Sequence, residues 1–275
     1  MEFKASDVAK LRQMTGAGMM DCKKALVEAN GDYERAKEII REKGELVAAK
    51  RADRETTEGS VIGMVNAEAN KAILVCLGCE TDFVAKNAEF QELANGIAKA
   101  ALEAMPADMD GLKAAKVNGM TIEEAVTQQT GKSGEKHSVA YYNSISAPFI
   151  AAYNHTNGKV STIVGFNKAI DAHVAREIAM QITAMNPVSI SKDDCPKDVI
   201  EKEMEIYREQ IKAEGKPENM VDKIAAGKLN KFFKENTLED QACVTNESKL
   251  SVSAYLKTID PEVKVVAFRR FSLND

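Results

Sequence analysis

Two short motifs contain residue types that other proteins use in redox-active thiol pairs, in metal sites or in phosphate-binding loops. Cys76 and Cys79 have the Cys-x-x-Cys spacing found in redox pairs and in zinc sites. A redox pair places its first thiol at a helix N-terminus, whereas Cys76 ends a β-rich run, and zinc needs two further ligands that no paired histidine spacing supplies. In an extended chain the two side chains point to opposite faces. We therefore interpret both as small, buried strand residues.

The second motif, Gly131-Lys132-Ser133, matches the end of a phosphate-binding loop. That loop requires a glycine five residues before its Gly-Lys pair and a strand before the loop. Val126 occupies the glycine position, and a helical pattern precedes the motif. We therefore interpret the motif as a flexible polar loop.

His155, beside the Asn157-Gly158 turn, could serve as a base, although such a histidine more often lies at a surface or an interface. The chain has no Gly-x-Ser-x-Gly nucleophile motif. The sequence thus predicts no catalytic residue, no metal site and no cofactor.

The stretch CETDFVAKN places a large apolar ring, Phe83, next to Asp82 at the junction of a strand-like and a helix-like segment. Such a ring either fills a core or is offered to a partner. The residues alone leave both interpretations open.

Composition indicates an ordinary soluble protein of several units. The chain has 275 residues, 44% of them hydrophobic and 29% charged, which favours two or three units over one core. A net charge of −5 does not favour a sequence-independent nucleic-acid binder. No run approaches the roughly 18 apolar residues of a membrane span, and the N-terminus lacks a signal peptide's apolar centre. Five scattered cysteines fit a reducing compartment, so we expect a cytoplasmic protein.

The first unit is predicted to be three short helices. Ser6 or Asp7 can cap the first, which stops near Gly16, and the second ends at Asn30-Gly31. Asp32 caps the third helix, and Gly44 ends it. Residues 44–58 are expected to be a helix tail followed by a linker.

A pattern of hairpin, helix and proline then occurs twice. Residues 60–81 contain two β-rich runs, followed by a helical period and Pro106; residues 148–166 contain two more, turning at Asn157-Gly158 and followed by a helix and Pro187. The repeat predicts an α+β fold with two similar subdomains and antiparallel sheets.

A helical hairpin is predicted between Pro187 and Asn236, turning at Lys216-Pro217, with arms that would reach about 28 Å. Ser248 is expected to cap a short helix, and the β-rich run Val263–Phe271 to return to a sheet. The residues alone favour a modular binding or regulatory protein. A thiol-dependent enzyme using Cys76 and Cys79 and an RNA-binding translation factor stay open as alternatives.

Three long motifs carry a family resemblance. The stretches Leu11–Leu26 (LRQMTGAGMMDCKKAL), Cys79–Asn87 (CETDFVAKN) and Gly215–Phe233 (GKPENMVDKIAAGKLNKFF) resemble, in the same order, signatures of bacterial translation elongation factor Ts. One departure is local: the family commonly has Glu-Val-Asn where this chain has Cys76, Leu77 and Gly78.

The resemblance implies a guanine nucleotide exchange factor for the GTPase elongation factor Tu, with no chemical catalysis. It implies that one segment touches the GTPase domain and that its aromatic wedges between two partner helices, which disturbs the magnesium and phosphate site. The matching residues here are Thr81, Asp82, Phe83 and Val84.

Two weaker contact regions are also implied. Arg12, Thr15 and Gly16 match the N-terminal signature and are implied to face the GTPase domain. His155 matches a histidine near the second hairpin turn that contacts another domain of the partner.

Pattern and resemblance together divide the chain. The resemblance implies that the first unit is like a ubiquitin-associated domain and that the helical hairpin can mediate a homodimer, while no direct nucleic-acid or membrane contact is expected. We expect an N-terminal three-helix domain at residues 1–54 and core subdomain N at 55–140. Core subdomain C is expected at 141–186 together with 237–260, interrupted by the helical-hairpin dimerisation insertion at 187–236. A C-terminal strand and tail module is expected at 261–275.

Overall fold

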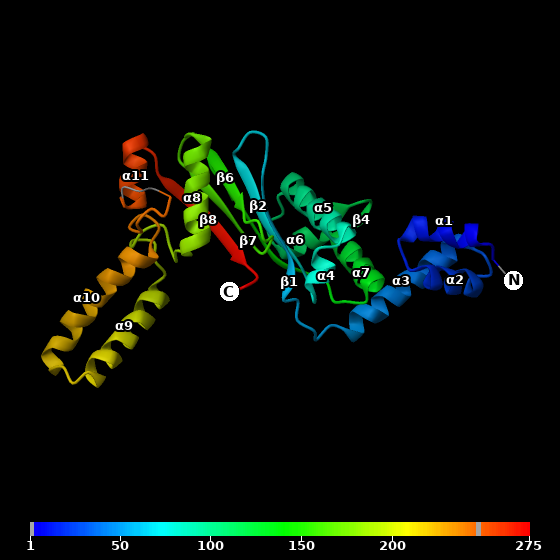
Figure 1. The fold of residues 1–275 in the computed structure, drawn as a ribbon, viewed down its shortest axis with the longest axis horizontal. Coiled ribbons are helices and arrows are strands. Elements are labelled where there is room, and N and C mark those ends of the chain that lie inside the picture. Colours follow the sequence, from blue (N-terminus) through cyan, green and yellow to red (C-terminus); the bar gives the residue numbers. More distant parts are fainter. Residues whose placement is uncertain (1–2, 246–248) are drawn as a thin grey trace.

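The fold is α+β, as the sequence predicts, and is drawn out between two helical ends. The computed structural model describes residues 3–245 and 249–275. Three N-terminal helices form one end, two three-stranded sheets with their covering helices form the middle, and a helical hairpin forms the other end (Figure 1). Among the described residues, no helix combines the length and apolar character that crossing a membrane requires.

The N-terminal unit consists of α1 (Ala5–Thr15), α2 (Met19–Glu28) and α3 (Tyr33–Lys50). Gly16 ends α1 in the left-handed conformation, with φ of 68°, and the Asp32 carboxylate accepts backbone N–H bonds at the start of α3, as predicted. A small core holds the helices together; its buried members include Val8, Leu11, Cys22, Ala25, Leu26 and Ala36.

Two expectations for these helices are wrong. The N-cap of α1 is Lys4, not Ser6 or Asp7; Asp7 contributes by accepting the Lys4 backbone N–H at 3.1 Å. Gly44 does not end α3, which continues to Lys50. Gly44 is a packing residue, because it lies against Gly131 where α3 crosses a core helix.

The first sheet has the antiparallel order β1-β2-β5, formed by β1 (Glu58–Val65), β2 (Lys71–Cys79) and β5 (Ser138–Ser146). Helix α5 (Ala88–Ala104) covers one face with the predicted apolar stripe. Residues 141–146, expected to open the second subdomain, are the end of β5 and pair with β2.

Short elements connect α5 to β5. They are α6 (Met109–Ala114), β3 (Lys116–Val117), β4 (Met120–Thr121) and α7 (Ile122–Ser133). Gly131-Lys132-Ser133 forms the last turn of α7, so the expected flexible loop is wrong; Gly134, in the left-handed conformation, is the C-cap of the helix.

The second sheet has the order β6-β7-β8, formed by β6 (Phe149–Asn154), β7 (Val160–Phe166) and β8 (Val265–Ser272), and α8 (Ala172–Met185) covers it. The repeat of hairpin and helix is thus confirmed, and the C-terminal β-rich run returns to this sheet as predicted.

The two sheets pack on each other through a shared apolar cluster that includes Val61, Leu74, Cys76, Ile150 and Ile163. The Asn154 side chain joins them as well, since it accepts the Gly63 N–H at 2.7 Å and donates to the Gly63 carbonyl at 3.0 Å. The two subdomains are therefore held as one body.

The helical hairpin is formed by α9 (Lys197–Ala213) and α10 (Glu218–Asn236), which begin directly after Pro196 and Pro217. It projects beyond α8 and the second sheet (Figure 1). Ser251 caps the last helix, α11 (Val252–Ile259); the expected cap, Ser248, lies outside the described residues.

Candidate functional site

Phe83 lies in the short helix α4 (Asp82–Ala85), which follows β2, and its side chain projects into solvent. It is 83% exposed, so it is not a core plug. Its neighbours face inward: Val84 is partly buried against the first core, and Ala85 is buried in it. The segment thus anchors itself through two residues and presents a third.

Asp82, next to Phe83, carries a negative charge at the same surface. The Lys86 ammonium donates a hydrogen bond of 2.6 Å to its carboxylate. This bond is the main reason why the pKa of Asp82 lies below its usual value. Asp82 is therefore ionised at neutral pH.

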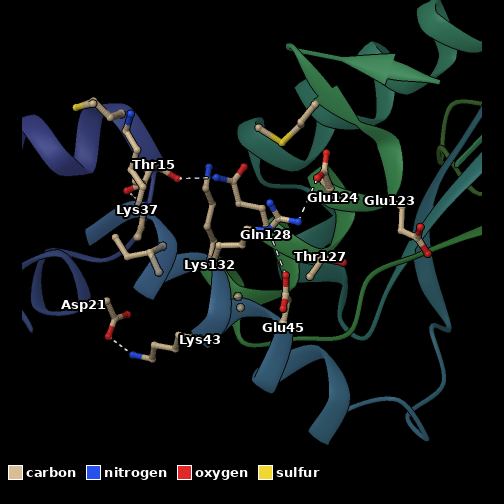
Figure 2. A pocket seen from close by; sticks show the side chains of 17 residues that line it. Thr15, Asp21, Lys37, Lys43, Glu45, Glu123, Glu124, Thr127, Gln128 and Lys132 are labelled. Carbon is tan, nitrogen blue, oxygen red and sulfur yellow. Dashed lines mark hydrogen bonds and ion pairs between the residues drawn. The ribbon is translucent and has the colours of Figure 1, made fainter. Parts of the chain in front are cut away.

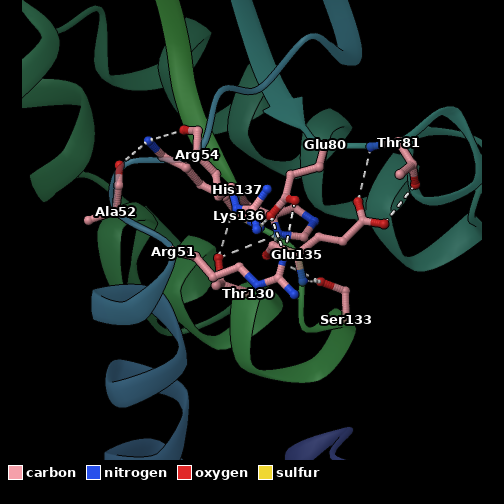
Figure 3. Close-up of polar contacts among 10 residues, drawn as sticks. All are labelled: Arg51, Ala52, Arg54, Glu80, Thr81, Thr130, Ser133, Glu135, Lys136 and His137. Carbon is pink, nitrogen blue, oxygen red and sulfur yellow. Dashed lines mark hydrogen bonds and ion pairs between the residues drawn. The ribbon is translucent and has the colours of Figure 1, made fainter.

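A polar network holds the junction between β2 and α4 (Figure 3). The Thr81 N–H and hydroxyl both donate to the Glu135 carboxylate, at 3.1 and 2.7 Å. Arg51 donates to both carboxylate oxygens of Glu80 at 2.9 Å, and the Lys136 N–H donates to one of them at 2.6 Å. The bond from Lys136 is the main cause of the lowered pKa of Glu80.

Sequence reasoning did not find Glu135, Arg51 or Glu80. Glu135 lies 54 positions from Thr81, and Arg51 lies 29 positions from Glu80. No periodicity or motif relates residues so far apart.

The second hairpin turn lies near α4. The Val61 N–H donates to the Gly158 carbonyl at 2.8 Å, and Lys159 pairs with Glu58 at 2.6 Å. An open cavity of about 450 Å³ lies between the two regions; its lining includes Glu58, Asp82, Lys86, Asn157 and Lys159. The fold therefore places the β6–β7 turn across a cavity from Asp82.

His155 begins this turn and is partly buried. Its Nδ1 atom lies 3.1 Å from the Tyr153 hydroxyl, and the two rings are in contact. The predicted contact residue is thus oriented by a neighbouring side chain.

The N-terminal residues predicted to contact a partner differ in exposure. Arg12 is exposed, whereas Thr15 is 7% exposed and its hydroxyl donates to the Leu11 carbonyl at 2.8 Å. Thr15 therefore stabilises the helix end. Sequence reasoning missed three exposed methionines near this helix end: Met14 in α1, and Met19 and Met20 at the start of α2.

A cavity of about 530 Å³ lies where the N-terminal helices meet α7 (Figure 2). Polar contacts border it: Gln128 donates to the Thr15 carbonyl at 3.3 Å, and Arg41 pairs with Glu124 at 3.2 Å. The N-terminal unit rests on the core at this joint.

The cysteines are placed as predicted. Cys76 and Cys79 are both buried and belong to different apolar clusters on opposite faces of β2. Burial raises the pKa of each thiol to about 12. In the described part of the chain, no group of three or more His, Cys, Asp or Glu residues could hold a metal ion.

These features define a modular α+β protein that holds an aromatic side chain, Phe83, outside its cores. Comparison with known proteins supplies the family. The model of a family described as "Elongation factor TS" matches residues 80–275. Relatives named "Elongation factor Ts" come from Porphyromonas gingivalis (47% identical, covering 100% of this chain and 99% of the relative), Amoebophilus asiaticus (47%, 98% and 98%) and Christiangramia forsetii (46%, 98% and 98%).

The chain belongs to the elongation factor Ts family, a family of translation elongation factors. The resemblance carried by the three motifs is thereby confirmed.

Proposed function

We propose that this protein is the guanine nucleotide exchange factor for elongation factor Tu. It binds the GDP form, promotes GDP release by disturbing the magnesium and phosphate site, and holds the nucleotide-free GTPase until GTP binds. The observation that carries the proposal is the 83% exposure of Phe83 on a capped turn beside an ionised Asp82.

An aromatic ring held in water favours binding. Burying Phe83 in a partner would contribute roughly 1.5–3 kcal/mol. A ring inserted between two partner helices displaces the elements next to the bound magnesium, and the loss of that ion's coordination weakens GDP binding because the cation neutralises phosphate charge. Asp82 brings a further negative charge to the same place.

The wedge cannot account for exchange alone. Shifting a two-state equilibrium from 1:99 to 99:1 needs about 5.5 kcal/mol of differential affinity, which exceeds the contribution of one ring. The remainder comes from a wider contact, for which the exposed methionines of α1 and α2 and the turn that carries His155 are suited. Because coupling is reciprocal, GDP or GTP expels the factor in turn, and no bond is made or broken.

The test measures release of a fluorescent GDP analogue from purified elongation factor Tu. The wild-type protein should accelerate release strongly, and Phe83→Ala and Asp82→Ala should reduce the acceleration. For Phe83→Ala the expected loss is roughly 10- to 100-fold, the rate equivalent of the burial energy. Met220→Ala is the matched control, because Met220 is an exposed apolar residue on α10.

Each outcome has a distinct meaning. No acceleration by the wild type would exclude an exchange function. Acceleration that survives both substitutions would keep the function and reject the wedge.

We also propose a cytoplasmic location and an optional homodimer through α9 and α10. These two helices pack on each other through a small cluster around Ile211, Val221 and Ala225, and we expect the second copy to pack on their outer faces. Sedimentation of the full chain, compared with a chain lacking residues 197–236, tests the dimer: a concentration-dependent dimer only in the full chain is the expected result.

A further inference from the structure

We propose that Glu135 is the positioning residue for Phe83. It holds Thr81 at the start of α4 and so sets the direction in which the ring leaves the surface. The inference rests on the proposed function, since the direction matters only if Phe83 enters a partner.

Three hydrogen bonds connect Glu135 to α4 through Thr81. Both donors of Thr81, its N–H and its hydroxyl, bind one carboxylate at 3.1 and 2.7 Å. The same hydroxyl oxygen accepts the Val84 N–H at 3.4 Å. Glu135 is thus connected through Thr81 to the residue that follows Phe83.

α4 needs outside support because it has only four residues, Asp82–Ala85. A helix of this length cannot sustain itself, since nucleating the first turn is unfavourable. The charge-assisted bonds from Thr81 supply an anchor at its N-terminal end.

Hydrogen bonds on both sides fix the backbone of Glu135. It follows the end of α7 at Gly134, and its N–H donates to the Ser133 hydroxyl at 3.1 Å. Its carbonyl oxygen lies 2.9 Å from Nδ1 of His137, a ring that is 6% exposed and contacts Phe90 in the core. The carboxylate is therefore carried by a loop that is fixed at both sides.

Because Glu80 has partners of its own, replacing Glu135 tests the support of α4 alone. Arg51 and the Lys136 N–H hold Glu80, one residue before Thr81, without using the Glu135 carboxylate. Replacing Glu135 should consequently leave the end of β2 in place and release only the start of α4.

The first test measures the mobility of the side chain at position 83 and needs no partner. The chain contains no tryptophan, so Phe83→Trp introduces a single tryptophan, which can be excited at wavelengths where the six tyrosines do not absorb. Its fluorescence anisotropy should fall when Glu135→Ala or Thr81→Val is added. Glu123→Ala, which removes an exposed carboxylate from α7, the helix that precedes Glu135, should leave it unchanged.

The second test reads exchange. Glu135→Ala alone should slow GDP release roughly tenfold, the factor that corresponds to one hydrogen bond to a charged group. Added to Phe83→Ala, it should cost little more, because Glu135 acts through the ring. A residue that only supported folding would give additive losses.

The proposal is overturned if the anisotropy is unaffected by Glu135→Ala, or if the two exchange losses add. The failure of the proposed function would look different: the wild type would not accelerate GDP release, while the anisotropy result could still be obtained.

Discussion

A Cβ atom at Gly131 would lie 2.7 Å from the Cα atom of Gly44, so α7 has no room for a side chain at the point where it crosses α3. Gly44 is buried within α3. Because α7 also ends at the loop that holds Thr81, this crossing connects the N-terminal helices to the segment that carries Phe83.

Gly131→Ala should loosen the N-terminal unit. The added methyl group meets backbone atoms, which cannot rotate away, and overpacking of this kind costs about 1–3 kcal/mol. That cost equals or exceeds the gain of about 1 kcal/mol from replacing a helical glycine with alanine. Hydrogen–deuterium exchange should become faster in α1 to α3 and stay unchanged in α5.

Gly227→Ala provides the control for this substitution. Gly227 lies in α10, and a Cβ atom there would meet nothing within 4 Å. The helix should be stabilised by roughly 0.5–1 kcal/mol, with slower exchange in α10. Equal behaviour of the two variants would mean that the α3–α7 crossing can yield.

Phe83→Ala should reduce exchange without reducing stability. Its ring is 83% exposed, whereas Phe90, seven residues later, is 0% exposed in the first core. Phe90→Ala should lower the free energy of unfolding by about 3–5 kcal/mol, and Phe83→Ala by less than about 0.5 kcal/mol. Urea unfolding measures both, and a large loss in Phe83→Ala would place the ring in the fold instead of at a partner.

Cys76 and Cys79 should not react while the protein is folded. Their pKa values of about 12 keep both thiols protonated at pH 8, and both are buried. Alkylation followed by mass spectrometry should modify them only after denaturation. The double Cys→Ala variant should retain exchange and lose about 1 kcal/mol of stability per site; loss of activity with the fold intact would revive the thiol-dependent alternative.

Stability should fall as the pH drops below about 6.5, the ordinary pKa of histidine. Desolvation is the largest cause that lowers the pKa of His137 in the folded protein, against the opposing effects of the Glu135 carbonyl and of the charges on Glu135 and Glu80. The unfolded chain therefore takes up the proton first, and the free energy of unfolding decreases by at most about 1.4 kcal/mol per pH unit.

The measurement compares urea unfolding at pH 7.5 and pH 5.5. The pH-dependent loss should shrink in His137→Gln and persist in His173→Gln, because the His173 side chain is 80% exposed. The lowered pKa values of Glu80 and Asp82 act below pH 4.5, outside this window. An unchanged loss in His137→Gln would assign the pH dependence to other groups.

Local chemistry in the sequence predicted most elements of the fold. Asp32 and Gly16 mark helix ends through capping and left-handed geometry, and the apolar stripe of α5 predicts the face that covers the first sheet. Alternation along β2 separates Cys76 from Cys79 on opposite faces. These features depend on residues close together in the chain, which is why sequence patterns report them.

Gly44 shows where such reasoning fails. A glycine after a helical stripe is a normal stop signal, yet here it sits inside α3 because α7 approaches it. Gly131, which the motif predicts to lie in a loop, likewise belongs to the last turn of α7, where it packs against Gly44. In both cases a packing partner distant in sequence overrides a local preference.

By itself, the sequence determined the α+β class, the repeat of hairpin and helix, the family and the segment that carries Phe83. Only the tertiary structure decided that this ring faces solvent and not a core. It also decided that Glu135 and Glu80 hold the junction between β2 and α4, from which the ring projects. The physical reason is that exposure and long-range hydrogen bonds depend on which segments pack together after folding. Local spacing in the chain does not determine which distant segments come into contact.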